Sequence, residues 1–315
     1  MTMPPPITPP AARSRLRDAG KDEGLSGCEA TPERLCRFVE ADGVAVHLID
    51  EGPFNPSRGD APSPAVLLLS AQWLSAQCLD RWASLLAQQH RVIRIDLPGH
   101  GPTGPFPDGD YSAARYARLI DALLIEIAPG PYVLVGASFS GIAAAIHAAR
   151  APKQLRGLAL ATSSGLPRAA GTPQPNAAPP NPAWADENAP RPPAFYAWKL
   201  DSLLRRPMTE SVRQSLIEEV TATNERPGRA EESRARVAGH DPDALTKALR
   251  QLGVPLLVQW SSDSTYLPPA MAEQVAALAA GHSSVRHYPD TGHLLLLDAP
   301  DETARDLLLF LETLR

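Results

Sequence analysis

An apolar run that ends abruptly at small residues, 132–141, is the feature that most restricts what this chain can fold into. The segment after it, 142–150, is rich in alanine and has high helix propensity. A buried strand, a tight turn and a helix in this order place Ser138 at the exposed apex of a sharp bend. Gly136 leaves room on one side of that apex, whereas Ser140 does so only approximately on the other. Ser138 is therefore a candidate nucleophile, and the alternative is an ordinary serine–glycine turn.

Composition restricts the partners and the compartment. The 315 residues carry a net charge of −5, without a strong concentration of lysine or arginine, which argues against nucleic acid or an anionic membrane as the main partner. Residues 1–20 lack the apolar core of a signal peptide, and we expect no segment of the roughly 20 apolar residues that span a bilayer. The cysteines, Cys28, Cys36 and Cys78, lack metal-ligand spacing and are predicted to be free thiols of a cytoplasmic protein.

Most of the chain alternates between predicted strands and predicted helices. Buried, unalternating strands in such an order predict a mostly parallel sheet with helices on both faces. The strands are expected at 36–40, 44–49, 65–69, 92–95, 131–135, 155–161, 255–260 and 285–288. The helices are expected at 79–89, 111–128, 142–150, 194–205, 209–224, 230–237, 243–252, 269–280 and 300–314.

Two segments depart from this alternation and set the predicted domain boundaries. Residues 1–34 are rich in proline and polar side chains, which predicts a disordered tail. Proline is also frequent between 172 and 193, where the alternation fails. The core is therefore predicted to comprise 35–164 and 250–315, and 165–249 is predicted to be a helical cap over the carboxyl edge of the sheet.

Three short segments carry a resemblance to a known family. They are RVIRIDLPGHG at 91–101, VLVGASFSG at 133–141 and YPDTGH at 288–293. In this order, from about Phe38 to its end, the chain resembles the α/β-hydrolase superfamily, and in particular its cap-bearing serine hydrolase and esterase branch. The resemblance implies the α/β-hydrolase fold, with a mostly parallel central sheet flanked by helices and a helical cap insertion. It implies no metal and no organic cofactor.

The resemblance also implies a general base for Ser138. A serine hydroxyl is a weak nucleophile, so it needs a base within hydrogen-bond reach and a group that orients the base. His293 follows a short strand and a turn at Gly292, where the family has its catalytic histidine. The alternative is a surface or structural histidine.

The third member of the triad departs from the family pattern, W-G-x-x-D-x-x-x-P. When Trp260 and Pro268 are aligned with that pattern, Ser264 occupies the acidic position. Asp263 lies one residue earlier and is the carboxylate available in this loop, so the resemblance implies Asp263 as the acid. The alternative is an ordinary loop aspartate, with His293 oriented by another group.

The predicted oxyanion hole and the substrate-binding residues depend on two loops and the cap. Two backbone N–H groups must point at the developing negative charge, and the resemblance implies those of Phe139 and Gln72. The family usually has His-Gly where this chain has Ser70-Ala71, so the side chains of Gln72 and Trp73 are alternative pocket groups. We expect the substrate to contact Trp73 and three aromatic residues of the cap, Phe195, Tyr196 and Trp198. The alternative role of the three cap residues is to pack the cap on the body.

These features predict a serine hydrolase that cleaves carboxylic esters of small to medium apolar compounds through an acyl-enzyme intermediate. We expect a monomer or weak homodimer whose partner is a small apolar molecule, with no cofactor. One alternative is a C–C hydrolase, lyase or other metabolite-tailoring enzyme on the same fold. Another is a non-catalytic ligand-binding protein with a degenerate site. Turnover of p-nitrophenyl esters separates these functions.

Overall fold

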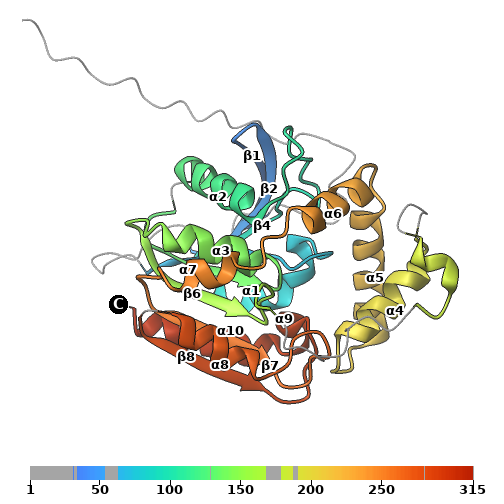
Figure 1. The fold of residues 1–315 in the computed structure, drawn as a ribbon. Helices are drawn as coiled ribbons and strands as arrows, with labels where there is room; N and C mark the ends of the chain where they lie inside the picture. The colour runs from blue at the N-terminus through green and yellow to red at the C-terminus, as the bar shows by residue number, and fades with distance from the viewer. Residues whose placement is uncertain are drawn as a thin grey trace, which may run out of the picture.

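A twisted eight-stranded sheet forms the centre of the protein in the computed structural model (Figure 1), which describes residues 31, 34–53, 63–127, 129–167, 179–186, 191–279 and 281–314. The strand order is β1-β2-β4-β3-β5-β6-β7-β8. β2 pairs antiparallel with β1 and β4, and all other neighbours are parallel, which confirms the predicted mostly parallel sheet. The strands are β1 (Arg34–Ala41), β2 (Val44–Glu51), β3 (Ala65–Leu69), β4 (Val92–Ile95), β5 (Tyr132–Ala137), β6 (Leu155–Ala161), β7 (Leu256–Ser261) and β8 (Ser283–Tyr288).

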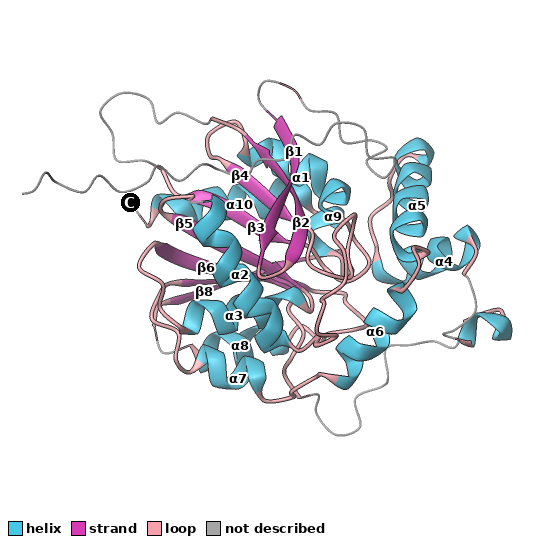
Figure 2. Cartoon of the chain, turned by 90° about the horizontal axis from the view of Figure 1, so that it is seen from above, coloured by secondary structure: helices cyan, strands magenta, loops and turns pink. Residues whose placement is uncertain are grey.

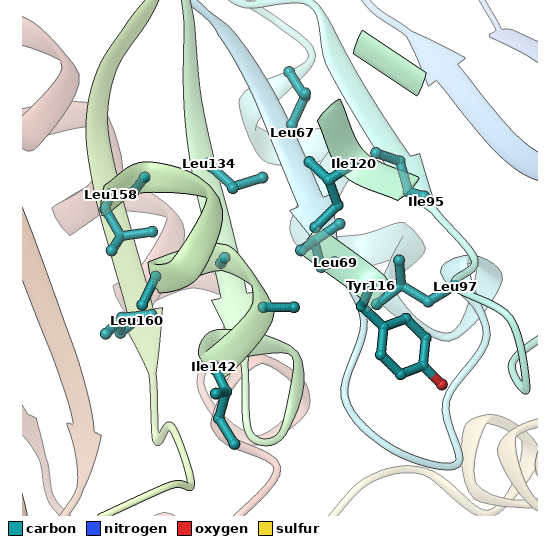
Figure 3. Packing of buried hydrophobic residues seen from close by; sticks show 14 of the residues in the cluster. Leu67, Leu69, Ile95, Leu97, Tyr116, Ile120, Leu134, Ile142, Leu158 and Leu160 are labelled. Atoms are coloured by element: carbon teal, nitrogen blue, oxygen red, sulfur yellow. The ribbon is translucent and has the colours of Figure 1, made fainter. Parts of the chain in front are cut away.

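Helices cover both faces of the sheet (Figure 2). One face packs against α2 (Ala113–Ile127), α3 (Ser140–Ala149), α7 (Ala244–Leu249) and α8 (Met271–Leu278). The other packs against α1 (Asp80–Leu86) and α10 (Pro300–Glu312). Successive residues of a strand point to opposite faces, so Leu67 packs with the first set and Leu68 with the second. Figure 3 shows the first of these clusters, where Leu67 and Leu134 lie near Ile120 of α2.

The helices between β6 and α7 form the segment that the sequence predicts to be a cap. It contains the short helix η2 (Pro182–Ala185), α4 (Pro193–Leu203), α5 (Glu210–Asn224) and α6 (Arg229–Ala238), which lie on one side of the sheet in Figure 1. α7 belongs instead to the core, because Leu245 and Leu249 are fully buried in the cluster that contains α3. The predicted cap, 165–249, is therefore too long by one helix. Two short helices, η1 (Ala76–Leu79) and α9 (Leu295–Asp298), were not predicted as separate elements.

Several predictions concern segments that are only partly described. The predicted tail, 1–34, lies outside the described residues except for Thr31 and Arg34, which form an isolated bridge. Parts of 172–193 are also outside them. The prediction of free thiols is correct for Cys78 but wrong for Cys36, which is disulfide-bonded. Disulfides persist in oxidising compartments, so the cytoplasmic location stays a prediction that the cysteines no longer support. No helix in the described part of the chain is long and apolar enough to cross a membrane.

Candidate active site

The turn between β5 and α3 holds Ser138 in a strained conformation. Its φ is 54°, in the left-handed region that non-glycine residues rarely adopt and that is typical of functional sites. The end of β6 fixes this turn from the side. The Ser138 N–H donates to the Ala161 carbonyl (3.0 Å), and the Ser138 carbonyl accepts from the Ser164 N–H (3.1 Å). The side chain of Ser138 is thereby held at the carboxyl edge of the parallel strands.

Two glycines allow β5 and α3 to approach each other around this turn. A Cβ atom on Gly136 would lie 2.6 Å from the Cα of Gly141, and one on Gly141 would lie 2.1 Å from the Ser163 hydroxyl. Real Cβ atoms do not approach other atoms so closely. Gly141, one residue after Ser140, therefore meets a steric demand of the same crossing.

The hydroxyl of Ser140, two residues after the candidate nucleophile, has hydrogen-bond partners within the turn and in β3. It is fully buried, and its hydroxyl oxygen accepts from the Ala137 N–H (3.0 Å). Its hydroxyl proton lies within reach of the carbonyls of Leu69 and Ala137, each at 2.9 Å. Because Leu69 ends β3, this hydroxyl connects the nucleophile turn to the start of the predicted oxyanion loop.

The structure brings His293 to Ser138, although they lie far apart in the sequence. The distance from Ser138 Oγ to His293 Nε2 is 2.8 Å, a hydrogen bond of the geometry that nucleophile and base require. The loop carrying His293 is anchored by the carboxylate of Asp298, which accepts from the Gly292 N–H and from the Arg205 N–H at 3.0 Å. The cap therefore contributes to the position of the base.

The structure does not bring Asp263 to His293. Asp263 is exposed, and its Oδ2 accepts from the Asp290 N–H at 2.9 Å. The Nδ1 atom of His293 is buried and has no hydrogen-bond partner among the described residues. Ser264 is buried instead, but its hydroxyl accepts from the N–H of Leu267 (3.1 Å). As described, Ser138 and His293 form a dyad.

The groups near the imidazole of His293 are an aromatic ring and a lysine, and no carboxylate of the described residues is hydrogen-bonded to it. The Tyr266 ring stacks on the imidazole, with a centroid distance of 5.2 Å and an interplanar angle of 29°. Lys199 of α4 is hydrogen-bonded to the Tyr266 hydroxyl and lies 5.1 Å from the centroid of the Trp73 ring. Burial, with a smaller contribution from the charge of Lys199, lowers the pKa of His293 to about 4. The base is therefore neutral at physiological pH.

The predicted oxyanion loop is also strained and is tied to the cap. Trp73 has a φ of 77°, which turns the chain sharply after Gln72. The side-chain oxygen of Gln72 accepts from Trp73 Nε1 (3.0 Å) and from Arg236 Nη2 (3.1 Å). The same Arg236 guanidinium lies 5.1 Å from the ring centroid of Phe139, which also stacks on the ring of His100 at 5.3 Å. Arg236 of α6 thus contacts both residues predicted to supply oxyanion N–H groups.

A cavity of about 520 Å³ opens over Ser138 and His293 and extends beneath the cap. Of the aromatic residues predicted to contact substrate, Trp73, Phe195 and Trp198 line it. Tyr196 does not; it is buried, and its hydroxyl donates to Glu225 at 2.6 Å. Among the described lining residues there is no Asp or Glu. No cluster of three His, Cys, Asp or Glu in the described segments could hold a metal ion.

Comparison with known sequences identifies the family to which this arrangement belongs. A sequence model of the alpha/beta hydrolase family matches residues 66–306, which include Ser138 and His293. The chain belongs to the alpha/beta hydrolase family.

Individual alpha/beta hydrolases and esterases are similar to parts or all of the chain. An esterase of Mycobacterium tuberculosis is 31% identical over 154 residues, covering 47% of this chain and 51% of the relative. Pimeloyl-[acyl-carrier protein] methyl ester esterase of Chromobacterium violaceum is 35% identical over 101 residues, 32% of this chain and 37% of the relative. The match therefore spans about half or less of these relatives. The crystal structure of a bacterial membrane phospholipase A has a TM-score of 0.74 at 22% identity, covering 90% of this chain and 87% of that one, and confirms the α/β-hydrolase fold.

The position of Asp263 leads to a prediction that distinguishes this alpha/beta hydrolase from one with a complete triad. We expect Asp263→Asn to change kcat for p-nitrophenyl butyrate by no more than about twofold, as exposed substitutions usually do. Loss of a true triad acid lowers kcat by about 10⁴-fold. Steady-state kinetics of the purified variant distinguish these two outcomes. A loss of kcat of about 10⁴-fold would show that Asp263 is the triad acid.

The low pKa of His293 predicts an unusual pH profile. Only neutral His293 can accept the Ser138 proton, so kcat/KM is lost as the pH falls through that pKa, near pH 4 rather than near 6.5. In Lys199→Met the repelling charge is absent, which raises the pKa of His293 and moves this limb to higher pH. Lys199→Arg keeps the charge and is the matched control. Circular dichroism at each pH monitors unfolding, and a Lys199→Met profile that coincides with that of the wild type contradicts the electrostatic account.

Four residues around Ser138 and His293 were not predictable from the sequence: Lys199, Tyr266, Arg236 and Asp298. Lys199 and Tyr266 each lie next to a residue or motif that was considered, namely Trp198 and the loop after β7. Arg236 and Asp298 act across large sequence separations, and their contacts depend on how the cap and the His293 loop pack. The sequence contains no local signal for such contacts.

Proposed function

We propose that the protein is a serine hydrolase that cleaves carboxylic esters of small to medium apolar compounds through an acyl-enzyme intermediate. The hydrogen bond between Ser138 Oγ and His293 Nε2, 2.8 Å long at the base of a cavity, carries this proposal. Family membership and the esterase names of both curated relatives support an ester as the scissile group.

In the proposed acylation step, His293 Nε2 takes the proton of Ser138 as Oγ attacks the ester carbonyl. The N–H groups of Phe139 and Gln72 stabilise the oxyanion, and neither donates a hydrogen bond to another described residue. The imidazolium then gives its proton to the leaving alcohol. No described carboxylate stabilises this imidazolium, so it is a stronger acid and gives its proton to the alcohol readily. For the same reason, neutral His293 is a weaker base toward Ser138.

In the proposed deacylation step, water loses a proton to His293 and attacks the acyl carbonyl. His293 then returns the proton to Ser138 Oγ as the bond from Oγ to the acyl carbon breaks, which releases the acid and restores Ser138. Aromatic side chains from the cap form much of the wall above Ser138, including those of Trp184, Phe195 and Trp198. Such a wall suits an apolar acyl or aryl group, because burial of apolar surface contributes about 25 cal/mol per Å².

A fluorophosphonate probe tests the proposal without knowledge of the natural substrate. We expect stoichiometric labelling that peptide mass spectrometry assigns to Ser138 and that Ser138→Ala abolishes. Ser164→Ala, which removes another serine lining the same cavity, should still be labelled. Labelling at another serine, or a protein that binds p-nitrophenyl esters but neither reacts nor turns over, would refute the proposal. Turnover restricted to diketones would assign the alternative C–C hydrolase chemistry.

A further inference from the structure

A second cavity, here called the arginine cavity, adjoins the one over Ser138. It has a volume of about 260 Å³ and lies between the oxyanion loop and the cap. The two cavities share the side chains of Trp73, Arg191, Ala230 and Ser233, so a ligand in one lies against the wall of the other. The charged residues that line the arginine cavity are Arg191, Arg226, Arg229, Arg236, Glu225 and Glu231.

The acidic residues of this cavity already have hydrogen-bond or ion-pair partners within the protein. Glu225 accepts from the Tyr196 hydroxyl (2.6 Å) and from the Arg191 N–H (3.1 Å). Glu231 forms an ion pair with Arg234, which does not line the cavity. Arg229 is neutralised by Glu232, at 2.6 Å.

Three guanidinium groups of the arginine cavity have no ion-pair partner in the described part of the chain. Arg191, Arg226 and Arg236 form no ion pair with any described residue, and each is partly buried. Arg191 Nε and Arg236 Nη1 are buried nitrogen atoms with no hydrogen-bond partner. Burial and the neighbouring charge of Arg229 lower the pKa of Arg226. The carboxylates of Asp96 and Glu232 offset this lowering only in part. A partly buried cation without an ion-pair partner is poorly compensated, so this arrangement is suited to a bound anion.

The shape of the donors indicates the type of anion. Guanidinium groups present planar pairs of N–H donors that match the oxygens of phosphate and carboxylate groups. Ala230, which lies in both cavity walls, is in the first turn of α6, and the capping residue Gly228 provides no side-chain cap. Free N–H groups at such a helix end add to the attraction for an anion. Three unpaired cations favour a doubly charged group over a singly charged one.

We propose that the arginine cavity binds a phosphate-type dianion carried by the substrate at a distance from its ester group. Arg191, Arg226 and Arg236 hold the dianion, while the apolar part of the substrate lies between it and Ser138. This inference rests on the proposed ester hydrolysis and refines its substrate class, from a wholly apolar ester to an apolar ester with an acidic end.

The test compares p-nitrophenyl esters whose acyl chains end in a phosphonate, a carboxylate or a methyl group, each made with short, medium and long chains. We expect the best phosphonate ester to exceed its methyl-ended counterpart in kcat/KM by about tenfold or more, and to exceed the carboxylate ester. High salt should reduce this ratio, because exposed parts of the site are screened.

Variants assign the effect to the arginines. The readout is the ratio of kcat/KM for the phosphonate ester to that for the methyl-ended ester, which cancels general losses of activity. We expect Arg226→Gln and Arg191→Gln each to lower the ratio by about tenfold, and Arg213→Gln, at a partly exposed position on α5 that is paired with Asp201 and lines neither cavity, to leave it unchanged. A ratio near one in the wild type, a ratio that survives both substitutions, or a preference for the carboxylate ester would overturn the proposal.

Binding separates this inference from the proposed function. Calorimetry with an alkylphosphonate on the full-length Ser138→Ala protein should show saturable binding that Arg226→Gln weakens about tenfold. This result needs no turnover, so it can hold even when no ester is cleaved and the fluorophosphonate probe fails to react. Absence of binding alongside normal hydrolysis of the methyl-ended ester would refute the dianion site and leave the proposed function intact.

Discussion

Replacing Ser138 with Ala should lower kcat for p-nitrophenyl butyrate by about 10⁴-fold or more, to the rate left by binding and the oxyanion donors alone. The reason is that Oγ supplies both the attacking atom and the proton that His293 accepts at 2.8 Å. KM should change little, because the hydroxyl contributes a small part of the cavity wall. Stopped-flow and steady-state kinetics measure the effect, and near-ultraviolet circular dichroism verifies the fold.

The same dyad predicts that losses at its two members are not additive. His293→Ala should cost about as much as Ser138→Ala, and the double variant should be no slower than either single one, as expected of groups that act as a unit. If the two losses multiplied, the residues would act in separate steps. A Ser138→Ala enzyme that retained most of its kcat would show that another nucleophile carries the reaction.

The second large effect is expected on stability, at the crossing of β5 and α3. Gly136→Ala places a Cβ atom 2.6 Å from the Cα of Gly141, where only backbone could move aside. We expect the free energy of unfolding to fall by about 3 kcal/mol, the size of severe overpacking, and ester hydrolysis to fall with it because the turn at Ser138 shifts. Urea denaturation monitored by fluorescence measures the change.

Gly104→Ala is the matched control for this substitution. No atom lies within 4 Å of the Cβ position at Gly104, and its φ lies outside the left-handed region. Its free energy of unfolding should stay within about 0.5 kcal/mol of the wild type. Equal losses from the two substitutions would show that the close approach of β5 and α3 does not limit stability.

Much of the fold was predictable because it depends on local patterns that repeat along the chain. Continuous apolar runs, each bounded by glycine, proline or polar residues, located the parallel strands, and β6 has the predicted bounds of Leu155–Ala161. The steric account of Gly136 also holds, and the structure adds that the second close approach of the crossing falls at Gly141, one residue after Ser140. These features are set by backbone geometry and burial, which the sequence expresses directly.

The surroundings of the candidate base were less predictable, because they depend on which way neighbouring side chains turn. Asp263 and Ser264 are adjacent, yet the first is exposed and the second buried, and no pattern of residue types distinguishes these orientations. Lys199 lies in a largely apolar helix, α4. Which side of α4 faces the cavity depends on how the helix packs on the core, so the sequence did not indicate that Lys199 faces it. For the same reason, the sequence did not show that Tyr196 lies at the adjoining arginine cavity, where its hydroxyl donates to Glu225, and not at the cavity over Ser138.

Arg236 joins the cap to the side chains of both Gln72 and Phe139. Any displacement of α6 wide enough to admit a bulky molecule would withdraw this guanidinium from both at once. In the proposed mechanism, a substrate could then enter, but the loop that stabilises the oxyanion would lack its contacts with Arg236 until α6 returned. Ser138 would therefore have a supported oxyanion loop only while α6 is closed.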